Sequence, residues 1–185
     1  MQPLRQSILD MEAIMSVADI YEKRATFSFE VFPPKTDVGM EKLCGKDGVL
    51  DKLYTLEPDY ISCTYGAGGT NVGKNLEVLD KIQKDGKTIP VTHFTCIGNT
   101  KEDIKEKLQT YLDHGIDHML ALRGDLPFGW TGTNGDLHYA TELVKFVRKE
   151  FGDKFTIAVA GSPEGHIQCR SLEADIACLK QKQDS

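Results

Sequence analysis

The hydrophobic positions of the chain fall into two alternating patterns. Five short runs are apolar with few polar interruptions, which is typical of parallel strands covered on both faces. The stretches between them carry apolar residues every three or four positions, which predicts amphipathic helices. We expect strands over residues 26–32, 59–64, 89–96, 116–122 and 155–160.

A helix is expected after each strand. The helical sequence after the first strand contains a glycine break, and later helices begin at typical capping residues. The expected ranges are 35–56 with a break at 44–48, 75–84, 101–113 with Thr100 as N-cap, 137–150, and a helix from about Ser171.

An additional amphipathic helix is expected over residues 7–24, before the first strand. It has no partner in the repeat that follows, so we expect it to cap the bottom or side of the strands. This divides the chain into a helical N-terminal extension, residues 1–24, and an α/β domain, residues 25–185.

Regular alternation of strands and helices with short connections predicts a parallel sheet with helices outside. A doubly wound sheet and a (β/α)8 barrel both fit. Polar residues end every strand, which favours the barrel, because a barrel brings all these ends to one mouth. A doubly wound sheet has its glycine fingerprint after the first strand, where this chain has Phe32-Pro33-Pro34-Lys35. A complete barrel needs eight units, so we expect five units of a TIM barrel from a longer protein.

Composition limits the classes of partner. The net charge of −6 and a pI of about 5.4 argue against nucleic acid as the main partner. No run approaches the length of a membrane span, and the N-terminus has no apolar core of a secretory signal. The five cysteines form no C-x-x-C pair, which predicts reduced thiols in a cytoplasmic protein, with Cys63 and Cys96 as small core residues.

The fourth strand is followed directly by residues suited to binding or catalysis. Its apolar run is followed by Arg123, Gly124 and Asp125, where a barrel keeps its active site. The alternative is an Arg–Asp pair that only closes the strand end.

Glu30 lies inside the first strand between Phe29 and Phe32. We expect a buried carboxyl, which needs a partner or has a raised pKa. It is either a general acid or the partner of Lys35 or another cation at a strand end.

Three further features are less specific. The loop over residues 65–71 is glycine-rich but matches neither phosphate-binding fingerprint, so a plain βα turn is the default. Gly115 separates His114 from His118, so we expect no metal site there. The loop over residues 128–135 is either a lid or a surface loop, and His93 faces either the mouth or the core.

Four segments taken together resemble the methylenetetrahydrofolate reductase family. Their order and spacing match, and the pattern continues through residues 163–166 and 174–182, so that the resemblance covers residues 25–183. The four segments are Phe27-Ser-Phe-Glu-Val-Phe-Pro-Pro-Lys35, Ser62-Cys-Thr-Tyr-Gly-Ala67, Thr92-His-Phe-Thr-Cys96 and Ala121-Leu-Arg-Gly-Asp-Leu-Pro127.

This resemblance implies an FAD across the mouth of a barrel, reduced by NADH or NADPH. The reduced flavin passes hydride to 5,10-methylenetetrahydrofolate and gives 5-methyltetrahydrofolate for one-carbon metabolism and methionine biosynthesis. It implies Glu30 as the acid that opens the substrate ring, and Asp125 as a carboxylate that tunes the flavin and orients the pterin. The residues it assigns to the flavin are Thr64, His93, Arg123, Gly124, Asp125, Tyr139, Ala140, His166, Asp175 and Lys182. It also implies a homo-oligomer.

Two departures from the family pattern stand out. Ser162 occupies a position where the family often has tyrosine, and a folate-binding glutamine of the sixth strand lies beyond Ser185. The rival hypothesis is a non-catalytic chain, which binds flavin only or is one piece of a split enzyme that needs a partner chain. An aldolase-type barrel is disfavoured, because no strand carries a lysine for a Schiff base.

Overall fold

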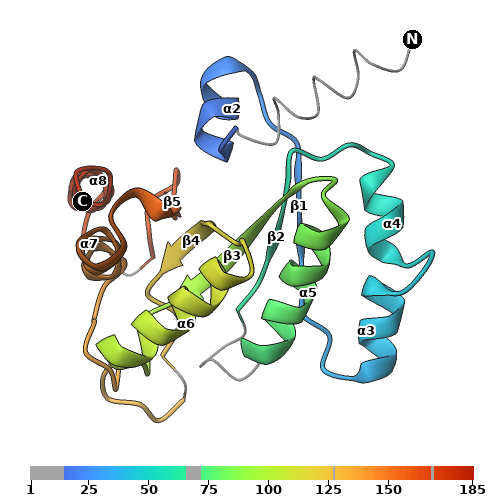
Figure 1. Cartoon of the computed structure of the whole chain (residues 1–185). Helices are drawn as coiled ribbons and strands as arrows, with labels where there is room; N and C mark the ends of the chain where they lie inside the picture. The colour runs from blue at the N-terminus through green and yellow to red at the C-terminus, as the bar shows by residue number, and fades with distance from the viewer. Residues whose placement is uncertain (1–14, 66–71, 127, 168) are drawn as a thin grey trace.

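The computed structural model of the chain describes residues 15–65, 72–126, 128–167 and 169–185. Its centre is a five-stranded sheet in which every neighbouring pair of strands is parallel (Figure 1). The strands are β1 (Ser28–Val31), β2 (Tyr60–Cys63), β3 (Ile89–Thr95), β4 (His118–Leu122) and β5 (Thr156–Val159).

The order of the strands decides between the two folds expected from the sequence. Each strand pairs with the next one along the chain, in the order β1-β2-β3-β4-β5. A doubly wound sheet reverses its strand order at a switch point. The chain is therefore an α/β protein with five βα units arranged as in part of a TIM barrel.

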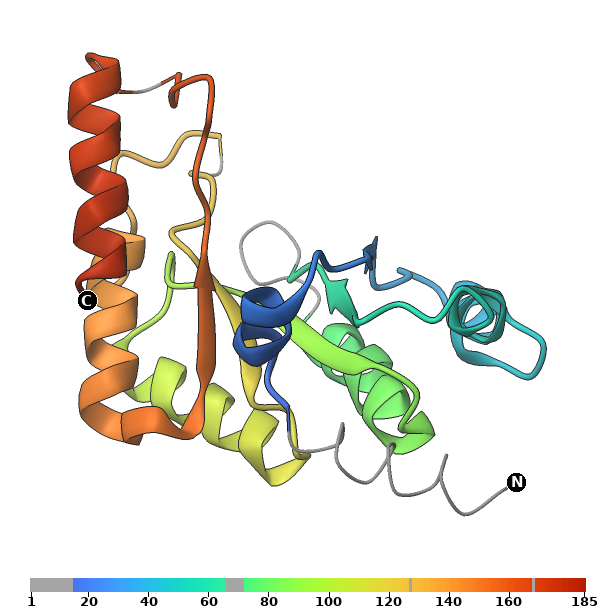
Figure 2. The ribbon, with the colours of Figure 1, turned by 90° about the horizontal axis from the view of Figure 1, so that it is seen from above.

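The helices follow the strands as expected. In the view from above, α5, α6 and α7 lie around the outside of β3, β4 and β5 (Figure 2). The helices are α2 (Val17–Lys23), α3 (Asp37–Cys44), α4 (Val49–Tyr54), α5 (Val72–Asp85), α6 (Lys101–Asp113), α7 (Ala140–Phe151) and α8 (Leu172–Gln183), with a 3-10 turn η2 (Gly152–Lys154) after α7.

Local sequence explains where these elements begin and end. Thr100 caps α6 as predicted, and the side chain of Asp103 binds the Thr100 N–H in return. The predicted strand over residues 116–122 begins only at His118. Gly115 adopts a φ of +73°, and the N–H of Ile116 donates to the carbonyl of Tyr111 in α6. Residues 116 and 117 therefore belong to the turn after α6 and not to the strand.

The two faces of the sheet differ in chemistry. Most residues that point outward are apolar and pack under the helices, among them Ile61, Phe94 and Met119, each at most 1% exposed, and the buried Thr92 shares this face. Cys63 and Cys96 lie in the same core, which confirms their predicted role. Side chains alternate along a strand, so the opposite, inner face carries Glu30, Ser62 and His93. The candidate site residues carried by the strands therefore lie on the inner face of the sheet or at the strand ends.

Helix α2 covers the N-terminal ends of the strands, as the predicted cap requires. The N–H of Val17 donates to Nε2 of His118 at 3.2 Å, and the Tyr21 and Tyr60 hydroxyls are 2.9 Å apart. His118 and Tyr60 are the first residues of β4 and β2. The first part of the predicted helix, residues 7–14, lies outside the described residues, and the division at residue 24 stays a prediction.

An ion pair attaches the segment after α2 to the sheet. The guanidinium of Arg24 binds both carboxylate oxygens of Asp59, and Asp59 also accepts the N–H of Phe27 at 2.8 Å. The Asp59 side chain is only 8% exposed. The hydrogen bond from Arg24, supported by the Phe27 N–H, holds the pKa of Asp59 below its usual value against the effect of burial.

The ion pair between Arg24 and Asp59 predicts that the free energy of unfolding decreases at acidic pH. A carboxyl whose pKa is lower in the folded state stabilises the fold above its unfolded pKa of about 4, and that contribution is lost as the pH falls through the lower folded pKa. Asp59→Asn should lose about 1–2 kcal/mol at neutral pH and flatten this acid-side decline in urea unfolding. The matched control is Asp153→Asn, whose side chain is fully exposed and should keep the original pH profile. An unchanged profile for Asp59→Asn would contradict the prediction.

Candidate functional site

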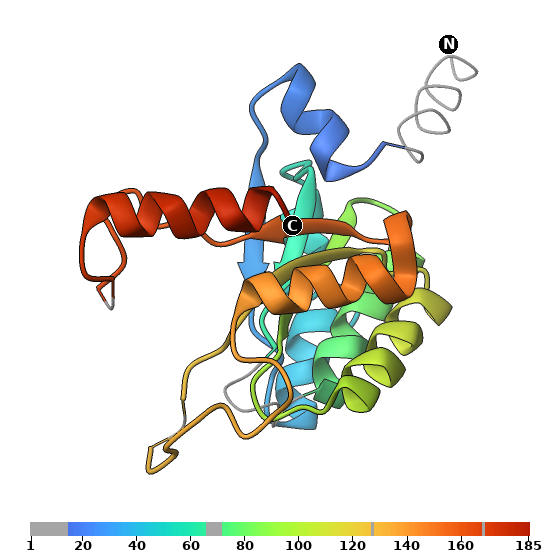
Figure 3. The ribbon, with the colours of Figure 1, turned by 90° about the vertical axis from the view of Figure 1, so that its left-hand side faces the viewer.

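A cleft of about 990 Å³ opens between the C-terminal ends of β4 and β5, the start of α7, and α8. Helix α8 runs beside α7, and β5 leads into the loop that precedes it (Figure 3). Eight of the ten residues that the sequence resemblance assigned to a flavin line this cleft. They are Arg123, Gly124, Asp125, Tyr139, Ala140, His166, Asp175 and Lys182.

The end of β4 forms one wall. Gly124 has a φ of +91°, and a Cβ there would lie 2.5 Å from Cγ2 of Ile97. Only glycine fits this position without strain. The chain turns there, the Nε of Arg123 donates to the Gly124 carbonyl at 3.1 Å, and the Asp125 carboxylate is exposed.

Helix α7 begins at the cleft with its N-terminal amides uncapped by a side chain. Its N-cap residue is Tyr139, whose side chain makes no capping hydrogen bond, and Ala140 and Thr141 line the cleft. The first N–H groups of a helix have no partner within the helix and carry partial positive charge. This wall therefore favours an anionic group.

Helix α8 forms the opposite wall. Leu172, Ile176 and Leu179 follow one another at helical spacing along the cleft and are 53%, 59% and 43% exposed. Beside them, Asp175 accepts the backbone N–H of His166 at 2.7 Å, and the Lys182 ammonium donates to the Ala160 carbonyl at 2.8 Å. The wall combines an apolar stripe with a cation.

The region of Ser162 departs from the family pattern and is filled differently. Ser162 lines the cleft, and its neighbour Gly161 faces Leu179, whose Cδ1 would be 3.4 Å from a Cβ at that glycine. Leu179 thus supplies apolar surface beside Ser162, the position where the sequence resemblance implies tyrosine.

Glu30, Thr64 and His93 lie apart from this cleft, on the first three strands. Glu30 pairs in register with Ser62, which pairs with Val91, two residues before His93. Glu30 and His93 therefore point to the same inner face, with Oε2 and Nε2 3.6 Å apart. Thr64 follows the last paired residue of β2 and donates its N–H to Val31.

The predicted burial of Glu30 between two aromatic rings is wrong for the described structure. Its side chain is 49% exposed. Successive strand residues point to opposite faces, so Phe29 packs with the helices, and Phe32 lies beyond the strand and is 68% exposed. The neighbour of Glu30 is instead His93, whose pKa burial lowers while the charge of Glu30 opposes the shift.

The remaining candidates do not converge on a site. His114 binds Asp80 at 2.7 Å and His118 binds Asp117 at 2.6 Å, so the two histidines have separate partners. No group of three potential metal ligands occurs within residues 15–65, 72–126, 128–167 and 169–185. Residues 66–71 of the glycine-rich loop lie outside the described residues.

The loop after β4 is tied to the turn between β3 and α6. Gly98 donates its N–H to Thr133 at 2.8 Å, Asp136 donates to Asn99, and the Trp130 ring lies against Gly98. Whether this loop acts as a lid stays a prediction.

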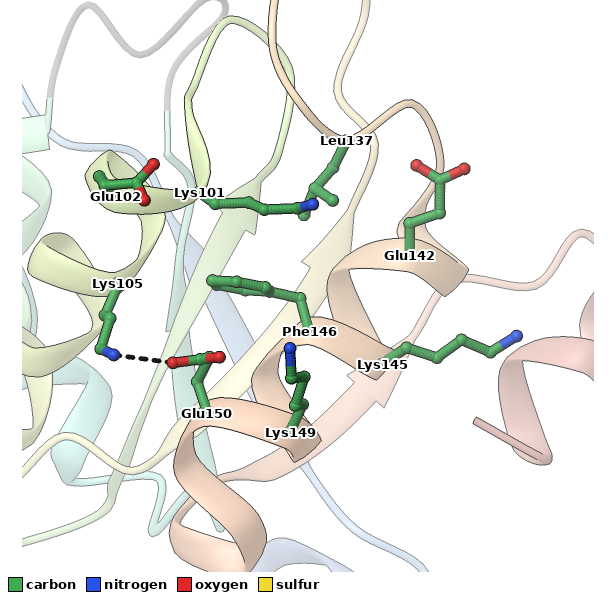
Figure 4. Close-up of a pocket in the computed structure, with 9 residues that line it drawn as sticks. All are labelled: Lys101, Glu102, Lys105, Leu137, Glu142, Lys145, Phe146, Lys149 and Glu150. Atoms are coloured by element: carbon green, nitrogen blue, oxygen red, sulfur yellow. Dashed lines mark hydrogen bonds and ion pairs between the residues drawn. The ribbon is translucent and has the colours of Figure 1, made fainter.

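A second hollow of about 440 Å³ lies on the outer surface between α6 and α7 (Figure 4). Lysines and glutamates alternate around Phe146, and Lys105 pairs with Glu150 at 2.7 Å. Positive and negative side chains alternate in this groove and do not point toward a common centre, so we assign no function to it. It is lined by Lys101, Glu102, Lys105, Leu137, Glu142, Lys145, Phe146, Lys149 and Glu150.

Comparison with known proteins decides which family this architecture represents. The family model described as methylenetetrahydrofolate reductase matches residues 14–185. The chain belongs to the methylenetetrahydrofolate reductase family. It is 35% identical to methylenetetrahydrofolate reductase (NADH) 1 of Arabidopsis thaliana, with 95% of this chain and 31% of the relative aligned.

Bacterial members of the family are similarly close. The 5,10-methylenetetrahydrofolate reductase of Pectobacterium carotovorum is 38% identical, with 92% of this chain and 54% of the relative aligned. That of Escherichia coli is 33% identical, with 98% and 55% aligned. The chain thus spans about a third of the plant reductase and about half of the bacterial ones. In the described part of the chain, no helix combines the length and apolar character needed to cross a membrane.

Proposed function

We propose that this chain carries the flavin-binding part of a methylenetetrahydrofolate reductase, which reduces 5,10-methylenetetrahydrofolate to 5-methyltetrahydrofolate at the expense of NADH or NADPH. The observation that carries the proposal is the single cleft along which eight residues assigned to FAD by sequence resemblance meet. When bound, FAD supplies the hydride-transfer chemistry.

The chemistry of the cleft fits FAD. A flavin dinucleotide has two aromatic ring systems joined by an anionic diphosphate. Arg123, His166 and Lys182 provide donors for the anion, together with the uncapped amides of α7. Lys182 uses one of its three N–H groups on Ala160 and keeps two for a ligand. The apolar stripe of α8 provides a surface against which the aromatic rings of FAD would pack.

Glu30 is proposed as the proton donor to the folate. Opening the substrate ring requires a proton on the nitrogen whose C–N bond breaks, and Glu30 on the inner face would supply it from its carboxyl group. Its Oε2 lies 3.6 Å from Nε2 of His93 on the same face. Asp125, at the rim of the cleft, would orient the pterin and tune the flavin.

A titration with FAD tests the cofactor part of this proposal. We expect visible absorption bands of bound, oxidised flavin that bleach on addition of NADH or NADPH. Lys182→Ala should weaken FAD binding about tenfold, because it removes a charge-assisted contact to the diphosphate. Lys52→Ala, an exposed lysine on α4 away from the cleft, is the matched control and should bind as the unsubstituted chain does. Absence of any spectral change at saturating FAD would overturn the proposal.

A flavin-binding chain without folate turnover is the second candidate. It is favoured by the separation of Glu30 and His93 from the main cleft. The same sample discriminates the two functions: flavin that bleaches with NADH or NADPH but does not reoxidise on adding 5,10-methylenetetrahydrofolate supports it. We also propose a cytoplasmic location, in keeping with the five free thiols.

A further inference from the structure

A buried polar cluster lies beneath the strand ends, between the sheet and helices α5 and α6. Its centre is Asn75, in the first turns of α5, whose side chain is completely inaccessible to solvent. The Asn75 amide nitrogen Nδ2 donates to the carbonyl oxygens of Cys63 at 3.1 Å and Thr64 at 2.9 Å. One side chain thus binds two successive carbonyls at the end of β2.

The other end of the same amide is also hydrogen-bonded. The Asn75 Oδ1 accepts the hydroxyl of Tyr111 from α6 at 2.6 Å and lies 3.3 Å from the hydroxyl of Thr92 in β3. Both amide N–H groups of Asn75 and one acceptor site of its Oδ1 thus have partners, and the Thr92 hydroxyl is within reach of the second acceptor site. The orientation is unique, because a flipped amide would set its oxygen against two carbonyl oxygens.

The hydrogen bonds of Asn75 lie where β2 ends and the following turn begins. Cys63 is the last residue of β2 in register with β3, and Thr64 begins the turn that follows. A buried carbonyl beyond the end of a ladder needs another donor, which Asn75 provides. The single hydroxyl proton of Thr92 donates either to Asn75 Oδ1 or to the carbonyl of His93, which lies 3.0 Å away. The cluster therefore ties α5 to the backbone at Cys63 and Thr64, and it contacts β3 at Thr92, the residue before His93.

We infer that Asn75 is a positioning residue of the flavin site, which sets the path of the chain at Thr64 without touching the cofactor itself. The inference rests on the proposed function and on the assignment of Thr64 and His93 to the flavin, which the sequence resemblance implies. A purely structural role would lower stability and leave the bound flavin unchanged. A positioning role changes the affinity for FAD and the spectrum of the bound flavin at temperatures where the protein stays folded.

The test compares Asn75→Leu with Tyr111→Phe in the full chain. Both variants remove buried hydrogen bonds of one cluster, but Tyr111→Phe leaves the amide bonds to Cys63 and Thr64 in place. Each is titrated with FAD well below its melting temperature, followed by visible absorption. We expect Asn75→Leu to bind FAD about tenfold more weakly and to shift the flavin bands, and Tyr111→Phe to bind within twofold of the unsubstituted chain.

The outcomes separate the inference from the proposed function. If the unsubstituted chain binds FAD and both variants bind it equally well with the same spectrum, the positioning role is overturned and the proposed function stands. If the unsubstituted chain takes up no FAD, the proposed function fails and the inference fails with it. Should Asn75→Leu not fold, Asn75→Ser replaces it, because serine keeps one donor, and the same difference from Tyr111→Phe is expected.

Discussion

Replacing Glu30 by glutamine is expected to lower the rate of folate reduction by about 100-fold or more, since general acid catalysis contributes on that scale. Glutamine keeps the size and hydrogen-bonding shape of the side chain but has no acidic proton to give. Reduction of the bound flavin by NADH or NADPH needs no proton from Glu30 and should keep its rate. Stopped-flow absorbance of the flavin in each half-reaction measures the two rates separately.

The control for this experiment is Glu41→Gln, which changes the same atoms on α3, away from the inner face of the sheet. It should leave both half-reactions unchanged. A Glu30→Gln protein that reduces folate at the rate of the unsubstituted protein would remove Glu30 from its proposed role. Equal loss in both half-reactions would instead indicate that the substitution disturbs the site as a whole.

A methyl group added at Gly124 is expected to destabilise the fold by about 2–5 kcal/mol. A side chain at positive φ costs about 1–2 kcal/mol, and overpacking adds about 1–3 kcal/mol. The added Cβ would lie 2.5 Å from Cγ2 of Ile97 and 3.1 Å from Cβ of Thr95; Thr95 is the last residue of β3, and Ile97 follows it. Thermal unfolding of Gly124→Ala should show a melting temperature about 5–15 °C lower.

Gly129→Ala separates the two causes. Gly129 has a similar φ of +84°, but a Cβ there would meet no atom within 4 Å. This control bears the cost of the backbone conformation alone and should lose only about 1–2 kcal/mol. Equal losses at both positions would show that the close approach of β4 to Ile97 contributes nothing.

Much of the fold could be predicted because its signals are local. The cap Thr100 and the start of a helix near Ser171 were placed correctly, since the side chain of each residue binds an amide three residues away. Five apolar runs predicted five strands for the same kind of reason. The choice between a barrel-type and a doubly wound sheet depends on which strands pair, and pairing between distant segments leaves no local mark.

The site was predictable where strand ends converge and less so where packing decides. The carboxyl ends of parallel strands meet at one edge, so Arg123 and His166 come to one cleft although they are far apart in sequence. The surroundings of Glu30 were misjudged, because residues adjacent along a strand face opposite sides of the sheet. Asn75 was missed, since a polar residue in a helix shows its buried partners only after the helix is packed.

The contact between Val17 and His118 joins residues 101 positions apart. A ribosome adds roughly 5–20 residues per second, so His118 is made about 5–20 s after Val17. Each βα unit pairs with its immediate neighbour and has no need of α2 to do so. During synthesis, the contact of α2 with β2 through Tyr21 and Tyr60 can therefore form first, and the contact of Val17 with His118 is added only after β4 has been made.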